Sequence, residues 1–356
     1  MAAVNREKIM QDTLDAIKSK IPGMTIGKYK NFGESIEVET ISTGSLALDN
    51  ILGGGAAKGR LFNLVGHTSS GKTTVALTII AELQRKKPDA NILYVDAENS
   101  LDVKYAKSLG VNVDEMYITQ PDCGEDGYEA ADIFLSSGIA DVVVIDSVAA
   151  MIPKAILMGE LGEQAQIGVG ARLDTQGIGR LFAKANKTKT TVIVINQWVE
   201  GVKINQFATG DKVSGNKYQP GGQYLPFYMT HIVEISRVGQ LEENGEVVSN
   251  QIRAYTRKNK IAPPYRTADF YITFGEGLDL VQEAIDLGIQ VGEVVKEGRQ
   301  IFKIKDAEQG FNGRQKFVRY LKDNRDVLDT LREAINVKIR GTQSDLIIEQ
   351  SKEDQE

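Results

Sequence analysis

The segment Gly66-His-Thr-Ser-Ser-Gly-Lys-Thr73 constrains this chain most, because it matches the phosphate-binding pattern G-x-x-x-x-G-K-[ST] in full. A short apolar run, Leu61–Val65, precedes it, and a helical pattern over Thr73–Arg85 follows it. Glycines let backbone N–H groups approach phosphates closely, and the positive end of the following helix attracts the anion. The sequence therefore predicts a strand–loop–helix unit that binds a nucleotide.

Within this loop, two side chains have expected tasks. Lys72 is expected to reach the β and γ phosphates, and the hydroxyl of Thr73 is expected to meet Mg²⁺. Asp146 ends the apolar run 142–145, where a carboxylate that faces the Mg²⁺ shell is usually found. The alternative for Asp146 is a residue that only caps its strand. The expected nucleotide contacts in the loop are Gly66, His67, Thr68, Ser69, Ser70, Gly71, Lys72, Thr73 and Thr74.

Strand and helix patterns alternate from about Thr43 to Phe274. Strands are expected at Leu61–Val65, Asn91–Val95, Asp141–Ile145, Thr191–Ile195, His231–Arg237 and Gln251–Thr256. The middle strands are continuously apolar, which is typical of a parallel sheet covered on both faces. The last two flank a hairpin-like turn at 242–246. We expect an α/β fold with a mostly parallel sheet and an antiparallel extension.

The two ends of the chain show different patterns. Apolar residues recur at helical spacing from Ile9 to Ile21 and predict a small N-terminal helical arm, residues 1–38. Its apolar stripe packs either on a neighbouring subunit or on its own core. After the core, residues 39–275, we expect a small α+β C-terminal domain, 276–341, and a mobile acidic tail, 342–356.

Composition narrows the class of protein further. The single cysteine, Cys123, and the two histidines, His67 and His231, argue against a disulfide and against a metal centre built from these side chains. No apolar run approaches the roughly 18–20 residues of a membrane span, and the first residues show no signal peptide. We therefore expect a cytoplasmic protein with no membrane partner.

Charge is distributed unevenly along the chain. The net charge of −6 argues weakly against a nucleic-acid partner, because such proteins are often basic. The stretch 296–325 nevertheless holds nine bases and four acids, whereas 342–356 holds five acids and one base. The basic stretch is either a solvated surface or a landing site for double-stranded DNA, for which the acidic tail could compete.

Polar residues follow two other predicted strands. Glu98 lies just past the strand that ends at Val95, at the carboxyl edge where parallel sheets bind ligands. It could orient and deprotonate an attacking water, and Asp96 is the competing candidate unless it is a buried cap. Gln197 ends the strand that begins at Thr191 and could sense a γ-phosphate, or it could simply begin a loop.

Two loops leave this edge of the sheet. Trp198–Pro220 is 23 residues long, and loops of this length are usually functional or disordered. It interleaves bases with aromatic rings, which suits single-stranded nucleic acid, although loop charges are more often only solvated. A glycine-bearing stretch, Met158–Gly170, follows the strand of Asp146 and leads into Arg172.

An ordered set of motifs resembles the RecA recombinase family, strongly over about residues 40–290. The motifs are Ser42–Asp49, Gly66–Thr74, Asp96-Ala-Glu98, Leu101-Asp102, Tyr105, Gln120-Pro-Asp122, Val144–Ala150, Gly159–Gly162, Asn196-Gln197, Gly221-Gly222, Lys258–Ala262 and Gly275–Gly277. The resemblance implies a RecA-type P-loop ATPase core and an ATP-dependent recombinase active in DNA repair and the SOS response. Such proteins polymerise on single-stranded DNA as helical filaments, pair it with homologous duplex and exchange strands.

The resemblance also implies roles for single residues. Glu98 resembles the catalytic glutamate, and Asp102 and Tyr105 look like adenine contacts. Gln197 looks like the γ-phosphate sensor. ATP would lie between subunits, and Lys258 and Lys260 look like the lysines that reach into the neighbour's site. The implied DNA-binding residues are Gly159, Gly162, Gln166, Ile167, Arg172, Trp198, Lys203, Phe207, Lys212, Lys217, Gly221, Gly222 and Gln223.

The chain departs from the family pattern at two places, which would suit a phage or plasmid member. His67-Thr68 stands where proline and glutamate are usual, and the second loop is several residues longer and contains Trp198. The alternatives are a hexameric helicase motor and a regulatory ATP-binding module. A helicase should show an arginine finger where Lys258-Asn-Lys260 stands, and a regulatory module would not need two such loops.

Overall fold

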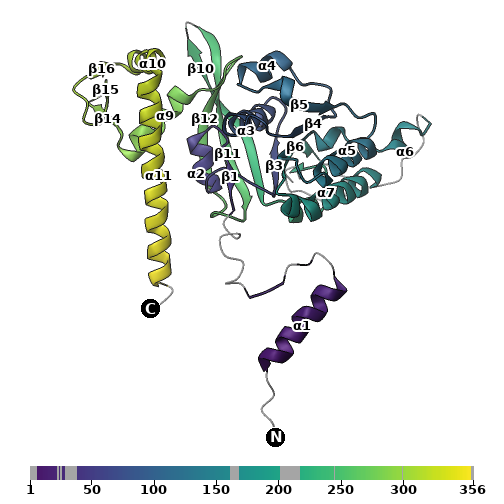
Figure 1. Cartoon of the computed structure of the whole chain (residues 1–356). Helices are drawn as coiled ribbons and strands as arrows, with labels where there is room; N and C mark the ends of the chain where they lie inside the picture. The colour runs from purple at the N-terminus through teal and green to yellow at the C-terminus, as the bar shows by residue number, and fades with distance from the viewer. Residues whose placement is uncertain are drawn as a thin grey trace, which may run out of the picture. The chain divides into compact units, whose positions relative to one another are not determined.

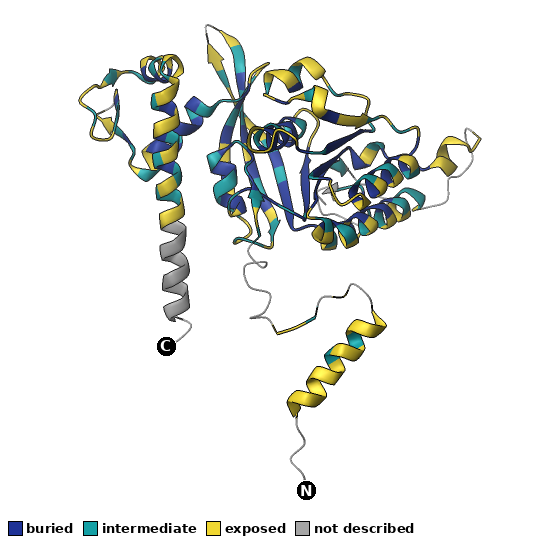
Figure 2. Cartoon of the chain, viewed as in Figure 1, coloured by how far each residue is buried: buried dark blue, intermediate teal, exposed yellow. Residues whose placement is uncertain are grey.

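The structure is a computed structural model that describes residues 6–21, 24, 26–28, 38–160, 168–200, 217–243, 245–298 and 300–353. Only the backbone is described at 200, 217–218 and 342–353. The chain divides into two units, Met1–Glu39 and Thr40–Glu356. In the first unit, the predicted helix is α1 (Arg6–Lys20). None of its residues is buried, and Ile9 and Met10 are more than half exposed (Figure 2).

The second unit is built on one nine-stranded sheet, shown in Figure 1. Its strand order is β13 (Gly277–Leu278), β12 (Thr267–Thr273), β11 (Glu246–Asn259), β10 (His231–Glu243), β3 (Leu61–Gly66), β7 (Thr191–Gln197), β6 (Val142–Asp146), β4 (Ile92–Asp96) and β5 (Met116–Thr119). Strands β10 to β5 run parallel, and β10 to β13 are antiparallel neighbours. The predicted α/β fold with an antiparallel extension is therefore confirmed.

The middle strands are buried because both faces of the sheet are covered. In β6, Val142 and Val144 join one apolar core, whereas Val143 and Ile145 join a second one. This alternation follows from the two-residue period of a strand. The first core contains residues of α2 (Leu46–Leu52), α3 (Lys72–Lys86) and α9 (Leu280–Val291). The second contains residues of α5 (Gly124–Ser136) and α7 (Val169–Thr188).

Shorter elements complete the second unit. The helices are α4 (Val103–Ser108), α6 (Lys154–Leu157) and α8 (Leu225–Tyr228), with 3-10 turns at Val113–Glu115 and Val148–Ala150. Strands β1 (Thr40–Ile41) and β2 (Ala56–Ala57) pair with each other, as do β8 (Val199–Glu200) and β9 (Lys217–Tyr218). Among the helices of the described residues, none combines the length and apolar character needed to cross a bilayer.

The C-terminal part contains a small antiparallel sheet and three helices. The sheet consists of β14 (Val294–Glu297), β15 (Ile301–Ile304) and β16 (Phe311–Asn312). After α9, the remaining helices are α10 (Arg314–Asp323) and α11 (Arg325–Glu353). Helix α11 continues to Glu353, through a proline-free stretch rich in helix-forming residues, and the mobility of the tail stays a prediction. The division into domains 39–275, 276–341 and 342–356 stays a prediction.

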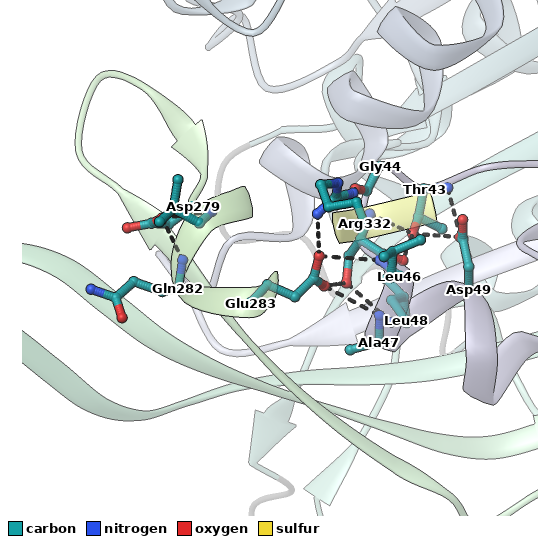
Figure 3. A network of polar contacts seen from close by, with 12 residues as sticks. Thr43, Gly44, Leu46, Ala47, Leu48, Asp49, Asp279, Gln282, Glu283 and Arg332 are labelled. Carbon is teal, nitrogen blue, oxygen red and sulfur yellow. Dashed lines mark hydrogen bonds and ion pairs between the residues drawn. The ribbon is translucent and has the colours of Figure 1, made fainter. Parts of the chain in front are cut away.

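One buried carboxylate connects the C-terminal helices to the start of the second unit (Figure 3). Glu283 of α9 is 3% exposed and forms an ion pair with Arg332 of α11, at 2.9 Å. It also accepts hydrogen bonds from the Ser45 hydroxyl and from the backbone N–H groups of Leu46 and Ala47. Helices α2, α9 and α11 are therefore joined through the carboxylate of Glu283. The first N–H groups of α2 donate to it, which places a negative charge at the positive end of that helix.

Removing this carboxylate should destabilise the fold strongly. Among the described residues, Glu283→Ala leaves the largely buried Arg332 guanidinium with only its hydrogen bond to the Gly44 carbonyl oxygen, and it leaves two N–H groups unpaired. We expect the free energy of unfolding, measured by urea denaturation, to fall by about 3 kcal/mol. The control Asp269→Ala removes the exposed Arg253–Asp269 pair and should change it far less. Equal losses in the two variants would contradict the argument.

Candidate functional site

The predicted phosphate loop joins β3 to α3 with two glycines in demanding positions. Gly66 ends β3, and a Cβ atom there would lie 2.3 Å from the carbonyl oxygen of Ile235. Gly71 precedes α3 with a φ angle of 96°, which side-chain residues rarely adopt. The loop can therefore keep its tight path, with the free N–H groups of the α3 N-terminus at its end.

Lys72 folds back over this loop. Its Nζ atom donates to the carbonyl oxygens of Gly66, at 3.2 Å, and His67, at 2.8 Å. Burial lowers the pKa of Lys72, and the nearby carboxylates Asp146 and Glu98 oppose that shift. A buried cation that contacts two backbone carbonyl oxygens is suited to an anionic ligand that replaces them.

Asp146 and Thr73, both expected at a Mg²⁺ site, lie together, and their metal role stays a prediction. The Thr73 hydroxyl donates to Asp146 Oδ2 at 3.0 Å, and the Tyr94 hydroxyl donates to the same oxygen at 2.7 Å. Burial raises the pKa of Asp146, while these two hydrogen bonds act in the opposite direction. Across the described residues, no cluster of three or more His, Cys, Asp or Glu side chains could hold a metal ion by itself.

Glu98 and Gln197 are in direct contact. Gln197 Nε2 donates to Glu98 Oε1 at 2.9 Å, and the hydroxyl of Ser147 donates to the same oxygen. Thr68 of the phosphate loop donates to Gln197 Oε1 at 3.4 Å. The ends of β3, β4, β6 and β7 thus meet at one edge. Sequence reasoning missed Ser147, although its position directly after Asp146 was a usable signal.

Asp96 has a structural partner set that distinguishes it from Glu98. Its carboxylate is buried and accepts from the N–H groups of Ser100 and Leu101 and from the side chain of Gln120. These contacts fix the turn after β4. The geometry therefore favours Glu98 over Asp96 as the side chain that faces the phosphate loop.

The two predicted adenine contacts lie at the start of α4. Asp102 caps this helix by accepting from the N–H groups of Lys104, at 2.8 Å, and Tyr105, at 3.1 Å. The Tyr105 hydroxyl lies 3.0 Å from the Thr74 hydroxyl, beside the phosphate loop. Tyr105 is therefore near the nucleotide edge, and the adenine role of both residues stays a prediction.

Lys258 and Lys260 lie away from the phosphate loop of their own chain. Through β10, Lys258 is level with Asn63, three residues before Gly66 on β3. Its Nζ atom donates to the carbonyl oxygen of Pro226 at 2.5 Å. Burial lowers the pKa of Lys258, and the nearby charge of Lys260 adds to that shift.

The predicted DNA-binding residues are only partly within the described structure. Gly162, Gln166, Ile167, Lys203, Phe207 and Lys212 lie outside the described residues, and Lys217 is described by its backbone alone. Gly159 and Arg172 are exposed, whereas Trp198 is half-buried and its indole N–H donates to Glu234 at 3.1 Å. Gly221, Gly222 and Gln223 line a cavity of about 700 Å³ together with Trp198.

Comparison with known proteins identifies the family of this chain. The family model for the RecA N-terminal domain matches residues 8–279. The chain belongs to the RecA family. Three relatives named Protein RecA align with it over most of their length. That of Paramagnetospirillum magneticum is 41% identical over 322 residues, or 90% of this chain and 86% of the relative. That of Azospirillum lipoferum is 42% identical over 339 residues, or 93% of this chain and 89% of the relative. That of Latilactobacillus sakei is 40% identical over 327 residues, or 90% of this chain and 88% of the relative.

In this RecA-family chain the cavity of about 700 Å³ has one buried titratable group in its wall. Asp174 of α7 is 5% exposed and accepts from the Tyr128 hydroxyl at 2.9 Å. Burial raises the pKa of Asp174 to about 7, although the hydrogen bonds from Tyr128 and the Gly221 N–H oppose the shift. Asp174 thus connects α7 to Gly221, the residue directly after the second loop.

This raised pKa predicts a pH-dependent stability. The folded chain binds the Asp174 proton up to about pH 7, whereas the ordinary pKa is 3.8. Stability should therefore fall as pH rises through this range, by about 1 kcal/mol between pH 6 and pH 8. Asp174→Asn keeps an acceptor for Tyr128 and removes the titration.

Urea unfolding of parent and variant at both pH values tests this expectation. The variant should gain about 1 kcal/mol relative to the parent on going from pH 6 to pH 8. Burial also raises the pKa of Asp49, to about 6. Because Asp49 is present in both chains, its contribution to the pH dependence cancels when the two are compared. A difference that stays constant with pH would contradict the assignment.

Proposed function

We propose that this chain is an ATP-dependent DNA recombinase that forms helical filaments on single-stranded DNA and catalyses homologous pairing and strand exchange. Membership of the RecA family supports this function. The observation that carries it is the hydrogen bond from Gln197 to Glu98, because it joins the nucleotide edge to the start of the loop 198–220. A change at the γ-phosphate can therefore reach the loop proposed to hold DNA.

The proposed reaction is hydrolysis of ATP to ADP and phosphate. The phosphate loop and Lys72 bind the phosphates, and Glu98 accepts a proton from the attacking water. Thr73 and Asp146 offer a hydroxyl and a carboxylate oxygen, a donor pair that fits Mg²⁺, whose usual ligands are oxygens. When bound, Mg²⁺ would neutralise phosphate charge.

The proposed partners are further copies of this chain and two forms of DNA in the cytoplasm. Single-stranded DNA binds at the loops after β6 and β7. Double-stranded DNA meets the basic stretch 296–325, on which Lys316 and Arg319 of α10 are exposed. Arg314 is less suited to that task, because it is bound to Asp286 at 2.6 Å and to Gln282. The acidic residues after 341 compete for the same surface.

The decisive experiment measures the ATPase rate with and without single-stranded DNA and images the protein with a non-hydrolysable ATP analogue. DNA should stimulate the rate, and helical filaments should form on DNA when the analogue is present. Closed hexameric rings would favour the helicase alternative. A rate insensitive to DNA, without filaments, would favour the regulatory module.

Glu98→Gln should separate binding from hydrolysis. The amide keeps the shape of the side chain and loses the base, so kcat should fall by roughly 10²–10⁴-fold, the usual contribution of a general base. Binding of ATP and of single-stranded DNA should change less than about twofold, as measured by equilibrium titration. Lys72→Ala should instead weaken ATP binding. If Glu98→Gln hydrolyses ATP at the wild-type rate, Glu98 is not the general base, and Asp96 becomes the candidate for that role.

Lys260 should act on the site of the neighbouring subunit. Lys260→Ala should lower DNA-stimulated ATPase at least about tenfold, because a cation beside the transferred phosphoryl group is lost. ATP affinity of the dispersed protein should stay near normal. Mixing Lys260→Ala chains with Glu98→Gln chains should restore activity at some interfaces. These are the interfaces where the Lys260→Ala chain supplies Glu98 and the Glu98→Gln chain supplies Lys260. Absence of rescue at every mixing ratio would argue against a shared site.

A further inference from the structure

Arg257 occupies an irregular position in the antiparallel part of the sheet. Lys258 pairs with Ile232 and Thr256 pairs with Val233, so Arg257 is the extra residue of a β-bulge in β11. A bulge redirects side chains relative to the regular alternation of a strand, and bulges are frequent beside functional sites. This bulge lies one residue before the first of the two lysines proposed to act between subunits.

The redirected side chain closes a three-residue contact. Arg257 Nε donates to Glu234 Oε2 at 2.8 Å, and the guanidinium carbon lies 5.0 Å from the centre of the Trp198 ring. The Trp198 indole N–H donates to the other oxygen, Glu234 Oε1, at 3.1 Å. Each residue touches the other two. We name Trp198, Glu234 and Arg257 the Trp198 clamp.

The clamp connects two residues with proposed roles through adjacent positions. Trp198 directly follows Gln197, which contacts Glu98. Arg257 directly precedes Lys258, whose Nζ atom holds the carbonyl oxygen of Pro226. Consecutive residues of β11 therefore contact both Trp198, at the start of the long loop, and Pro226 of α8, six residues after the loop ends.

Exposure indicates that this contact serves orientation more than stability. The side chain of Arg257 is 47% exposed and that of Glu234 is 22% exposed, so solvent screens their ion pair. The planar guanidinium nevertheless has a defined place, because it both stacks on an indole ring and donates to a carboxylate. Such a contact defines where the Arg257 side chain lies, and it can still break and re-form readily.

We propose that the Trp198 clamp is a positioning device that couples the ATP site of one subunit to the lysines that this subunit offers to its neighbour. When Gln197 responds to the γ-phosphate, Trp198 moves with it, and Arg257 carries the displacement to Lys258 and Lys260. The state of one ATP site thereby adjusts the next site along the filament. This inference rests on the proposed function, because it requires the lysines to act between subunits.

The test uses mixed filaments of full-length chains. Arg257→Ala alone should lower DNA-stimulated kcat roughly tenfold with an unchanged KM for ATP, because misplaced lysines weaken transition-state stabilisation. The matched control is Arg253→Ala, which removes a comparable ion pair from the same strand and should keep the parent rate. Arg257→Lys keeps the charge without the planar stack and should recover part of the loss.

Mixing then shows in which direction the clamp acts. An Arg257→Ala chain has an intact Glu98, and a Glu98→Gln chain has a correctly placed lysine pair. Interfaces that combine these halves should be active, so a 1:1 mixture should reach about a quarter of the parent rate if subunits assemble at random. Circular dichroism melting of each variant checks that it is folded.

The outcomes separate the clamp from the proposed function. If mixtures of Lys260→Ala and Glu98→Gln show no rescue, the shared site itself is wrong. If those mixtures are rescued and folded Arg257→Ala is not, the clamp acts only within its own subunit and the inference fails. Equal rates for Arg257→Ala and Arg253→Ala would also overturn it. If Arg257→Ala does not fold, Arg257→Lys takes its place, and a parent rate in that variant would overturn the role of the stack.

Discussion

The hydrogen bond between Gln197 and Glu98 is possible only because four parallel strands end at the same edge of the sheet. Strand β6 separates β4 from β7, so the two side chains reach across the end of one strand, where Ser147 joins them. The phosphate loop belongs to the same edge, because β3 lies beside β7 and Thr68 contacts Gln197. The phosphate loop, Glu98 and the start of the long loop are therefore brought together by strand order rather than by any local motif.

Much of this edge could be predicted from the sequence. The phosphate-loop pattern and the apolar runs before Asp146 and Gln197 carry short-range signals, because strand burial and loop glycines depend on neighbours in the chain. The Asp96 alternative could not be resolved that way, since one of the partners that occupy its carboxylate, Gln120, is 24 residues distant. The strand β5 was missed as well, because its edge position leaves Tyr117 and Ile118 exposed and weakens the burial pattern.

Contacts between distant segments account for the largest differences from sequence-based expectation. Trp198 was expected as a DNA contact, yet its indole N–H is engaged by Glu234, 36 residues away, and its ring by Arg257. Arg314 was counted as part of a basic surface, yet α9 supplies its partners. In both cases the residue type was informative, and only the fold could show that the charge or the ring was already in use.

The position of Trp198 has a practical consequence. It is the only tryptophan among 356 residues, so the intrinsic fluorescence excited at about 295 nm, where tyrosine absorbs little, comes from one place. Its ring lies beside a guanidinium and one residue after Gln197, and a displaced charge near an indole changes its emission. The molecule thus carries its own optical reporter at the joint between nucleotide and loop, and stopped-flow emission could follow its rearrangement in real time without a label.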